Sequence, residues 1–546
     1  MSHHQDHGGV QQPAAVTPPT PALDSTVPSP TPTRPPTPSE NESQMTAVGQ
    51  DTLEKEVAFP LSNGRKWCAL LVFVTSLFID VLSSSAFFVF TAPISEDLGI
   101  IFEQQTWIIT SYAVSFASFL LFWGRICDLF SAKAVFLYGF GTVGILNLIL
   151  SFLKDRYSFF VLRALTGVAG ACVVPAAYRL IAEVFPPGEQ RGRAYTIYGM
   201  TGSLANVSGT IIAGVFELIP NGGQMTAWRW FFRMVALVTI PSAIVAHFVI
   251  PPHEGGHTLE ITSKREKIKA MDLPGIGFML CAQLLLIMGL TFGATYGWTK
   301  ASFLAPFIIG ALLYPVFFWW ESRLPEIDAL LPPSIWRIPN VTVLVVFALI
   351  TLGWWGVNFM PFLELFHQVH GESMLLSAVR TLPEGIAAAI FSSMLVVWPS
   401  LTRHPRTPII ISMTMCCGAY ALWTQAKGVV GVDYWKWVFP GMVFGSAGMQ
   451  IVLVATNVGV MQAAPAGREG VIGAILQTSM QTSSVIALSI QAGLFTVNPG
   501  GLYNFANVQA SWYFELGWSI LWLIGFIVFY KPQKVAKGQA MPAMAH

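Results

Sequence analysis

The chain has 546 residues, of which 53% are hydrophobic and only 11% charged, and its formal net charge is +1. A soluble domain carries about 25% charged residues, so this composition excludes an ordinary soluble protein and indicates a membrane protein. The small net charge gives no electrostatic reason to expect a nucleic-acid partner. The six cysteines lie in or beside apolar segments, without the spacing of a disulfide framework or a zinc site, so no metal site is expected.

The N-terminal stretch, residues 1–62, is rich in Pro, Ser and Thr and differs from the rest of the chain. Such a segment cannot bury enough apolar area to offset its ordering entropy, so a disordered tail is predicted. No apolar core follows the first residues, which argues against a signal peptide.

Fourteen apolar segments follow, each long enough for a membrane-crossing helix, which needs about 20 mostly apolar residues. The loops on the same side of the membrane as the N-terminal tail hold about three times as many Lys and Arg residues as the loops on the other side. This bias predicts an even number of spans with both termini in the cytoplasm. The predicted spans are 67–92, 106–124, 133–153, 158–184, 194–217, 230–250, 274–295, 303–320, 341–363, 374–399, 407–425, 436–462, 470–495 and 513–530.

Charged and small residues mark the connection between the second and third spans and the fourth span itself. Gly124, Asp128 and Lys133 lie in the connection, and the fourth span contains Arg163 followed by Gly167 and Gly170. Together these resemble the major facilitator superfamily, which carries Gly-x-x-x-Asp-(Arg/Lys)-x-Gly-(Arg/Lys)-(Arg/Lys) in that loop and Arg-x-x-x-Gly-x-x-Gly in the fourth span. The loop motif is matched in part, and the departures are Leu129, Ser131 and Ala132.

The resemblance implies an all-α membrane protein with two six-helix halves, here with a two-helix hairpin inserted between them to give fourteen spans. That layout is similar to the fourteen-span drug:proton antiporter branch, and most similar to its fungal members. The implied divisions are a cytoplasmic tail (1–62), a first half (63–251), a cytoplasmic loop with the inserted hairpin (252–338), a second half (339–531) and a second cytoplasmic tail (532–546).

The branch implies a proton-coupled exporter of drug-like or metabolite-like compounds that works by alternating access. It would be a multi-pass protein of the plasma membrane, or of the vacuolar membrane, and a monomer. It would need no cofactor beyond a proton gradient, and no enzyme activity is expected, since no cluster of His, Asp and Glu has catalytic spacing. Two alternatives stay open: uptake or facilitated transport of a nutrient or small inorganic solute, and a non-transporting sensor.

Ionisable side chains inside spans are costly and are therefore the candidates for proton coupling. Asp80 lies near the middle of the first span, where desolvation disfavours its charged form. The antiporter branch has its Asp ten residues before a Pro, and counting back from Pro93 that position is Ser83. Asp80 is one helical turn away, so equivalence and a purely structural polar contact both remain possible.

Two further candidates lie in the fourth and tenth spans. A guanidinium keeps its proton, so Arg163 would hold a partner or tune a neighbour rather than carry the proton, unless it snorkels to the surface. Glu384 is four residues from Arg380 and either pairs with it or is a second proton site.

The motif residues Gly124, Asp128 and Lys133 would form a conformational latch, by resemblance, although Asp128 could also brace the junction of spans two and three or be a solvated loop charge. Polar residues in the spans suit either a substrate cavity or interhelical contacts: Ser83, Ser84, Asn206, Asn358, Asn457, Gln477 and Gln481. Small residues suit close helix packing: Gly167, Gly170, Gly209 and Gly214. In the fifth-span antiporter pattern Gly-Pro-x-x-Gly-Gly, Thr210 and Ala213 depart from the family residues.

Overall fold

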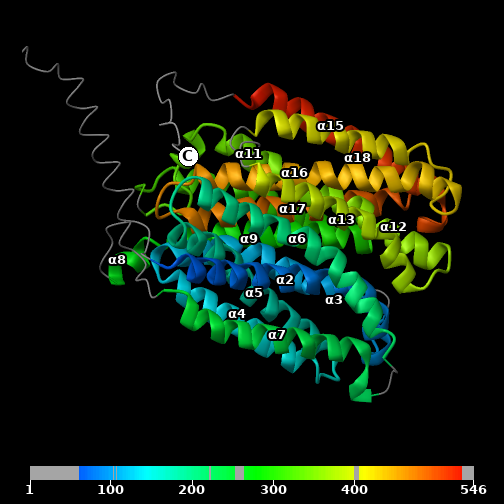
Figure 1. Cartoon of the computed structure of the whole chain (residues 1–546), viewed down its shortest axis with the longest axis horizontal. Helices are drawn as coiled ribbons and strands as arrows, with labels where there is room; N and C mark the ends of the chain where they lie inside the picture. Colours follow the sequence, from blue (N-terminus) through cyan, green and yellow to red (C-terminus); the bar gives the residue numbers. More distant parts are fainter. Residues whose placement is uncertain are drawn as a thin grey trace, which may run out of the picture. The chain divides into compact units, whose positions relative to one another are not determined.

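The computed structural model describes residues 61–101, 104–105, 107–219, 223–251, 264–326, 328–398 and 405–531. In these ranges the regular secondary structure is helical throughout, and Figure 1 shows the long helices lying side by side. This confirms the predicted all-α fold. Both predicted tails lie outside the described residues, except for residues 61 and 62 at the edge of the first.

Each of the fourteen predicted spans coincides with a helical segment in the described part of the chain. The segments are α2 (Asn63–Leu98), α3 (Trp107–Leu129), α4 (Ala132–Leu150), α5 (Arg156–Val184), α6 (Glu189–Phe216), α7 (Ala227–Val249), α9 (Leu273–Tyr296), α10 (Ala301–Glu321), α11 with α12 (Val341–Phe347 and Thr351–Glu364), α13 (Met374–Val397), α15 (Arg406–Trp423), α16 (Phe439–Gln462), α17 (Glu469–Leu494) and α18 (Phe505–Phe529).

Twelve of these segments are long and apolar enough to cross a membrane, judged by length and composition in the described ranges. The two that fall short are α6 and α15. Helix α6 is rich in Gly, Ser and Thr and packs along α2, α13 and α16. Helix α15 is long enough, but its Arg406, Pro408 and hydroxyl residues make it less apolar than those twelve segments. The fourteen-span count therefore goes beyond what length and composition establish.

Helix starts follow local capping chemistry. The side chain of Asp155 accepts a hydrogen bond from the backbone N–H of Ser158 at 2.7 Å, which satisfies a free donor at the start of α5. This hydrogen bond lowers the pKa of the exposed Asp155 carboxyl because it stabilises the charged form. Ser131 caps α4 in the same way, through the N–H of Ala134.

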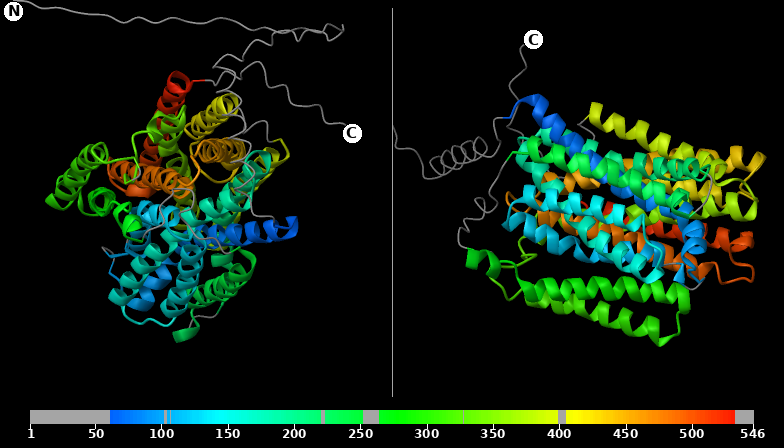
Figure 2. Two further views of the ribbon diagram at one scale, coloured as in Figure 1. Left: turned by 90° about the vertical axis from the view of Figure 1, so that its left-hand side faces the viewer. Right: turned by 90° about the horizontal axis from the view of Figure 1, so that it is seen from below.

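The helices pack as two groups with a hairpin beside them. Within the first group α3 packs on α5, α2 on α6 and α4 on α7, and within the second α15 and α13 pack on α16 and α12 on α17. Helices α9 and α10 pack on each other, and α9 also contacts α3 and α17, so the hairpin touches both groups. Figure 2 shows this green pair at one edge of the bundle.

The basic segment after the first group forms the short helix α8 (Lys264–Lys269). Directly after it, the carbonyl oxygen of Ala270 accepts hydrogen bonds from Nε and one terminal nitrogen of Arg125, at 2.8 and 2.5 Å. The arginine at the end of α3 thereby fixes the chain where it enters the hairpin.

Glycine allows the two hairpin helices to approach closely. A Cβ atom added at Gly289 would lie 2.8 Å from the backbone nitrogen of Phe307, whereas one added at Gly277 on the same helix would meet nothing within 4 Å. Gly289→Val should therefore force α9 and α10 apart and cost about 1–3 kcal/mol of stability.

Thermal unfolding of the purified protein measures this loss of stability, with Gly277→Val as the matched control for the change in helix propensity. Equal melting temperatures for the two variants would contradict the close hairpin contact.

Candidate functional site

A polar cluster lies inside the first helix group, where α2, α3 and α5 meet; we call Asp80, Tyr112 and Arg163 the Asp80 cluster. The Tyr112 hydroxyl donates a hydrogen bond to Oδ1 of Asp80. The Arg163 side chain is buried, with its guanidinium carbon 3.7 Å from the ring centre of Phe87 and 4.8 Å from that of Tyr112. Its Nε also donates to the carbonyl oxygen of Ile108 at 3.4 Å. The tyrosine thus lies between the carboxyl group and the guanidinium.

The two glycines of the fourth-span motif make room for this tyrosine. A Cβ at Gly167 would lie 2.4 Å from the Tyr112 carbonyl oxygen, and one at Gly170 would lie 2.6 Å from its hydroxyl. Any larger residue at either position would push α5 away from α3 and displace Tyr112 from Asp80. The Arg-x-x-x-Gly-x-x-Gly spacing therefore supplies both the guanidinium and the space for the hydroxyl beside the carboxyl.

Chemically, the Asp80 cluster has the parts of a proton-exchange site. Asp80 is partly buried, and its carboxyl group accepts the hydrogen bond from the Tyr112 hydroxyl. The tyrosine hydroxyl and the arginine charge both favour the ionised carboxylate, and burial disfavours it.

The first and second helix groups are joined by polar contacts along their seam. Near its middle, Ser203 on α6 donates to the side-chain oxygen of Gln450 on α16. Closer to one end, the side-chain nitrogen of Asn457 donates to the Tyr178 hydroxyl at 2.6 Å. The sequence left open whether Asn457 lines a cavity or makes an interhelical contact, and here it joins the two groups.

A further cross-group contact lies where α3 ends, and we call this end of the seam the latch end. The buried Asp128 carboxylate accepts the backbone N–H groups of Gly470 and Val471, both at 2.8 Å, at the N-terminus of α17. Free N–H groups and the helix dipole favour an anion at that position. A Cβ at Gly124 would lie 2.8 Å from the Gly470 carbonyl oxygen, so glycines on both helices permit this approach.

A buried charge network surrounds this contact. Arg179 on α5 forms ion pairs with Glu183 at 2.8 Å and with Glu469, the first residue of α17. All three side chains are buried. We call Asp128, Arg179, Glu183 and Glu469 the latch network. Because a desolvated charge is costly without its partner, this network couples the two groups tightly while it is complete.

The three predicted latch residues separate in the structure. Gly124 and Asp128 are helical, not part of a loop, because α3 continues to Leu129 and packs against α17. Asp128 therefore does not brace the junction of the second and third spans. Lys133 takes no part in this contact with α17. Its ammonium donates to the carbonyl oxygens of His247 and Ile250, at 2.8 and 2.5 Å, at the end of α7.

The expected pairing of Glu384 with Arg380 is wrong. Arg380 pairs with Glu372 at 2.6 Å, and both carboxyl oxygens of the buried Glu384 lack a hydrogen-bond partner among the described residues. Glu515 on α18 is equally buried and has no partner in the same ranges. The sequence did not single out Glu515, because the predicted span begins at residue 513 and places Glu515 at its end. In the structure α18 begins at Phe505, so Glu515 lies well inside the helix.

The remaining predicted polar residues are dispersed. The Ser84 hydroxyl bonds the Asp80 carbonyl, Asn206 accepts from Ser85, and Asn358 donates to the Trp354 carbonyl at 2.8 Å. Five are only partly buried, namely Ser83, Ser84, Asn206, Gln477 and Gln481.

Of the remaining glycines predicted for close packing, Gly209 packs against α2 and Gly214 against α13. A Cβ at Gly209 would lie 2.4 Å from the Leu82 carbonyl oxygen, and one at Gly214 would lie 3.2 Å from Cα of Leu375.

The chain belongs to the Major Facilitator Superfamily, whose family model matches residues 72–488. It is 25% identical to the "Major facilitator superfamily multidrug transporter mfsC" of Aspergillus fumigatus, over 84% of this chain and 85% of that protein. It is 24% identical to the "Low affinity ammonium transporter" of Saccharomyces cerevisiae, over 76% and 79% of the two chains. Other relatives are named as resistance or export proteins. The chain is thus a membrane transporter by family, not an enzyme.

Among solved structures, the human organic anion transporter MFSD10 (TETRAN) matches with a TM-score of 0.55, over 84% of this chain and 99% of that one. Its sequence is only 14% identical, so the match concerns the fold alone.

The latch network yields a stability prediction. Arg179→Gln leaves two buried carboxylates without their charge partner, so the variant should lose about 3–5 kcal/mol. Arg193→Gln is the matched control, since Arg193 also pairs with a glutamate four residues away, Glu189, but both side chains are about half exposed. That change should cost less than about 1 kcal/mol. Thermal unfolding measures the loss of stability in both variants. Similar losses for Arg179→Gln and Arg193→Gln would contradict a stabilising role of the latch network.

Proposed function

We propose that the protein is a proton-coupled exporter of small organic compounds that works by alternating access. The observation that carries the proposal is the Asp80 cluster, a carboxyl group inside the first helix group with a hydroxyl and a guanidinium placed to control its charge. The relative named as a multidrug transporter and those named as resistance or export proteins support the direction and the substrate class.

The fourteen-span layout is part of the proposal. Helices α6 and α15 lie along neighbours that are long and apolar enough to cross, so we infer that they cross too. Helices α9 and α10 then form a hairpin inserted between a first half (63–251) and a second half (339–531). An even count puts both described ends on one side of the membrane, which we take as the cytoplasm because of the basic loops there.

The latch network supports alternating access around a central site. Its charged contacts gather at one end of the seam, whereas at the other end α6 and α13 meet through Gly214 and Leu375. A complete network closes the cytoplasmic end and leaves the site accessible from the other side. Breaking the network and tightening the contact between α6 and α13 would expose the site to the cytoplasm.

The proton cycle follows from the charge of Asp80. An ionised Asp80 holds the Tyr112 hydroxyl and balances Arg163. Protonation removes that charge, weakens the hold on Tyr112 and lets α2 and α3 shift relative to each other. Three of the partly buried polar residues of the spans, Ser83, Gln477 and Gln481, would then contact the substrate, and Glu384 would serve as a second proton site.

The test is export driven by an imposed pH gradient. In proteoliposomes loaded with ethidium, wild-type protein should couple dye movement to inward proton flow, and Asp80→Asn should lose the coupling while keeping its melting temperature. Glu96→Gln, the same acid-to-amide change at an exposed position of α2, is the control and should retain coupling. Coupled transport that survives in Asp80→Asn would contradict the assignment of Asp80.

A second candidate function is facilitated movement of a small inorganic solute, which the relative named as an ammonium transporter favours. The same proteoliposomes distinguish this second function from proton-coupled export. Ammonium would move down its own gradient without proton exchange, and Asp80→Asn would leave the rate of ammonium movement unchanged.

A further inference from the structure

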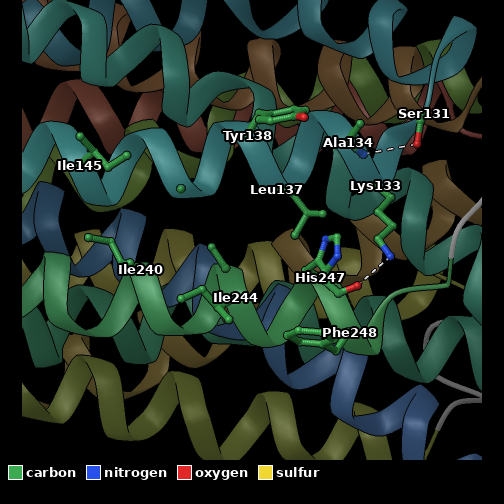
Figure 3. Close-up of a pocket in the computed structure, with 12 residues that line it drawn as sticks. Ser131, Lys133, Ala134, Leu137, Tyr138, Ile145, Ile240, Ile244, His247 and Phe248 are labelled. Carbon is green, nitrogen blue, oxygen red and sulfur yellow. Dashed lines mark hydrogen bonds between the residues drawn. The ribbon is translucent and has the colours of Figure 1, made fainter.

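A groove runs along the outer side of the first helix group, between α4 and α7 (Figure 3). Its volume is about 910 Å³, at the upper end of the roughly 300–1,000 Å³ of small-ligand pockets. The groove takes no part in the Asp80 cluster or the latch network.

One end of the groove is positively charged. Lys133 donates to two carbonyl oxygens at the end of α7, and Arg65 donates to the neighbouring carbonyls of Val249 and Phe248, at 2.8 and 3.0 Å. Both cations therefore bond the backbone of the same four-residue stretch at the end of α7. Among the described residues neither has a carboxylate partner, so their combined charge is not neutralised there.

Donors remain for a ligand at this end. An ammonium has three N–H donors and Lys133 uses two of them, while a guanidinium has five and Arg65 uses two. Figure 3 shows the Lys133 ammonium beside the exposed imidazole of His247 at the mouth of the groove.

The rest of the groove is apolar and has the length of a lipid chain. Leu137, Gly141 and Ile145 follow at four-residue spacing on α4 and face Ile240 and Ile244 on α7. The distance along α4 from Lys133 to Ile145 is about 18 Å at 1.5 Å per residue. One half of the hydrocarbon core is about 15 Å thick, so the groove spans one leaflet.

We propose that this groove binds one anionic phospholipid. Its phosphate lies against Lys133 and Arg65, and an acyl chain follows the apolar stretch between α4 and α7. The charge complementarity selects an anionic headgroup over a zwitterionic one, because two cations without a carboxylate leave an excess of positive charge. The site stands independently of the proposed transport reaction.

Native mass spectrometry of the purified full chain tests the charged end of the site. With phosphatidylglycerol and phosphatidylcholine added at equal concentrations, wild-type protein should retain one phosphatidylglycerol preferentially. The double variant Lys133→Gln, Arg65→Gln should lower this retention about tenfold, and Lys300→Gln, an exposed lysine at the start of α10, should not change it.

A second variant tests the apolar stretch and does not depend on the charges. A Cβ at Gly141 meets nothing within 4 Å, so Gly141→Leu should fold and fill the groove, which displaces the bound lipid. Gly525 on α18 is equally open, and Gly525→Leu should leave the lipid in place.

Two results would overturn the proposal. One is equal retention of phosphatidylglycerol by wild-type protein and Gly141→Leu. The other is full displacement by equimolar glycerophosphoglycerol, the headgroup without chains, which would show that only a free phosphate group is recognised.

Discussion

The structure depends on a set of desolvated charges that joins two helix groups at one end. Asp128 satisfies two N–H groups at the start of α17, and Arg179 pairs with Glu183 and with Glu469 beside them. Buried ion pairs of this kind add little stability compared with apolar packing, but they are costly to leave incomplete. Such contacts suit an interface between two helix groups that is either fully formed or fully broken. Alternating access requires an interface of this kind.

The latch network and the Asp80 cluster share two helices. Helix α3 carries Tyr112 and Asp128, and α5 carries Arg163 and Arg179. On each helix the two residues are sixteen positions apart, about 24 Å at 1.5 Å per residue. A displacement of α3 or α5 that follows a change of charge at Asp80 therefore also moves one member of the latch network. In this account, α3 and α5 transmit a change in the charge of Asp80 to the latch network, and so couple proton binding to the conformational change.

The sequence predicted much of the fold and less of the site. Hydrophobic segments located the helical segments, and Asp80 and Arg163 were each recognisable as ionisable residues inside a span, because these signals are local. The contacts of both residues with Tyr112 join three helices and could not be predicted from spacing. The pairing of Arg179 with Glu469 crosses 290 positions and could not be predicted from spacing, although Arg179 and Glu183 inside an apolar span were a signal. Glu515 was overlooked because helix boundaries are the least certain part of such predictions.

Distances across the seam, measured between spin-label pairs in proteoliposomes, test the central claim most directly. One pair, Gln190 and Ala466, lies at the latch end, and the other, Leu218 and Ser373, at the opposite end, with all four positions exposed. The account predicts that acidification, which protonates Asp80, lengthens the first distance and shortens the second, and that Asp80→Asn holds this state at neutral pH. Distances that stay fixed, or that change in the same direction at both ends, would contradict it.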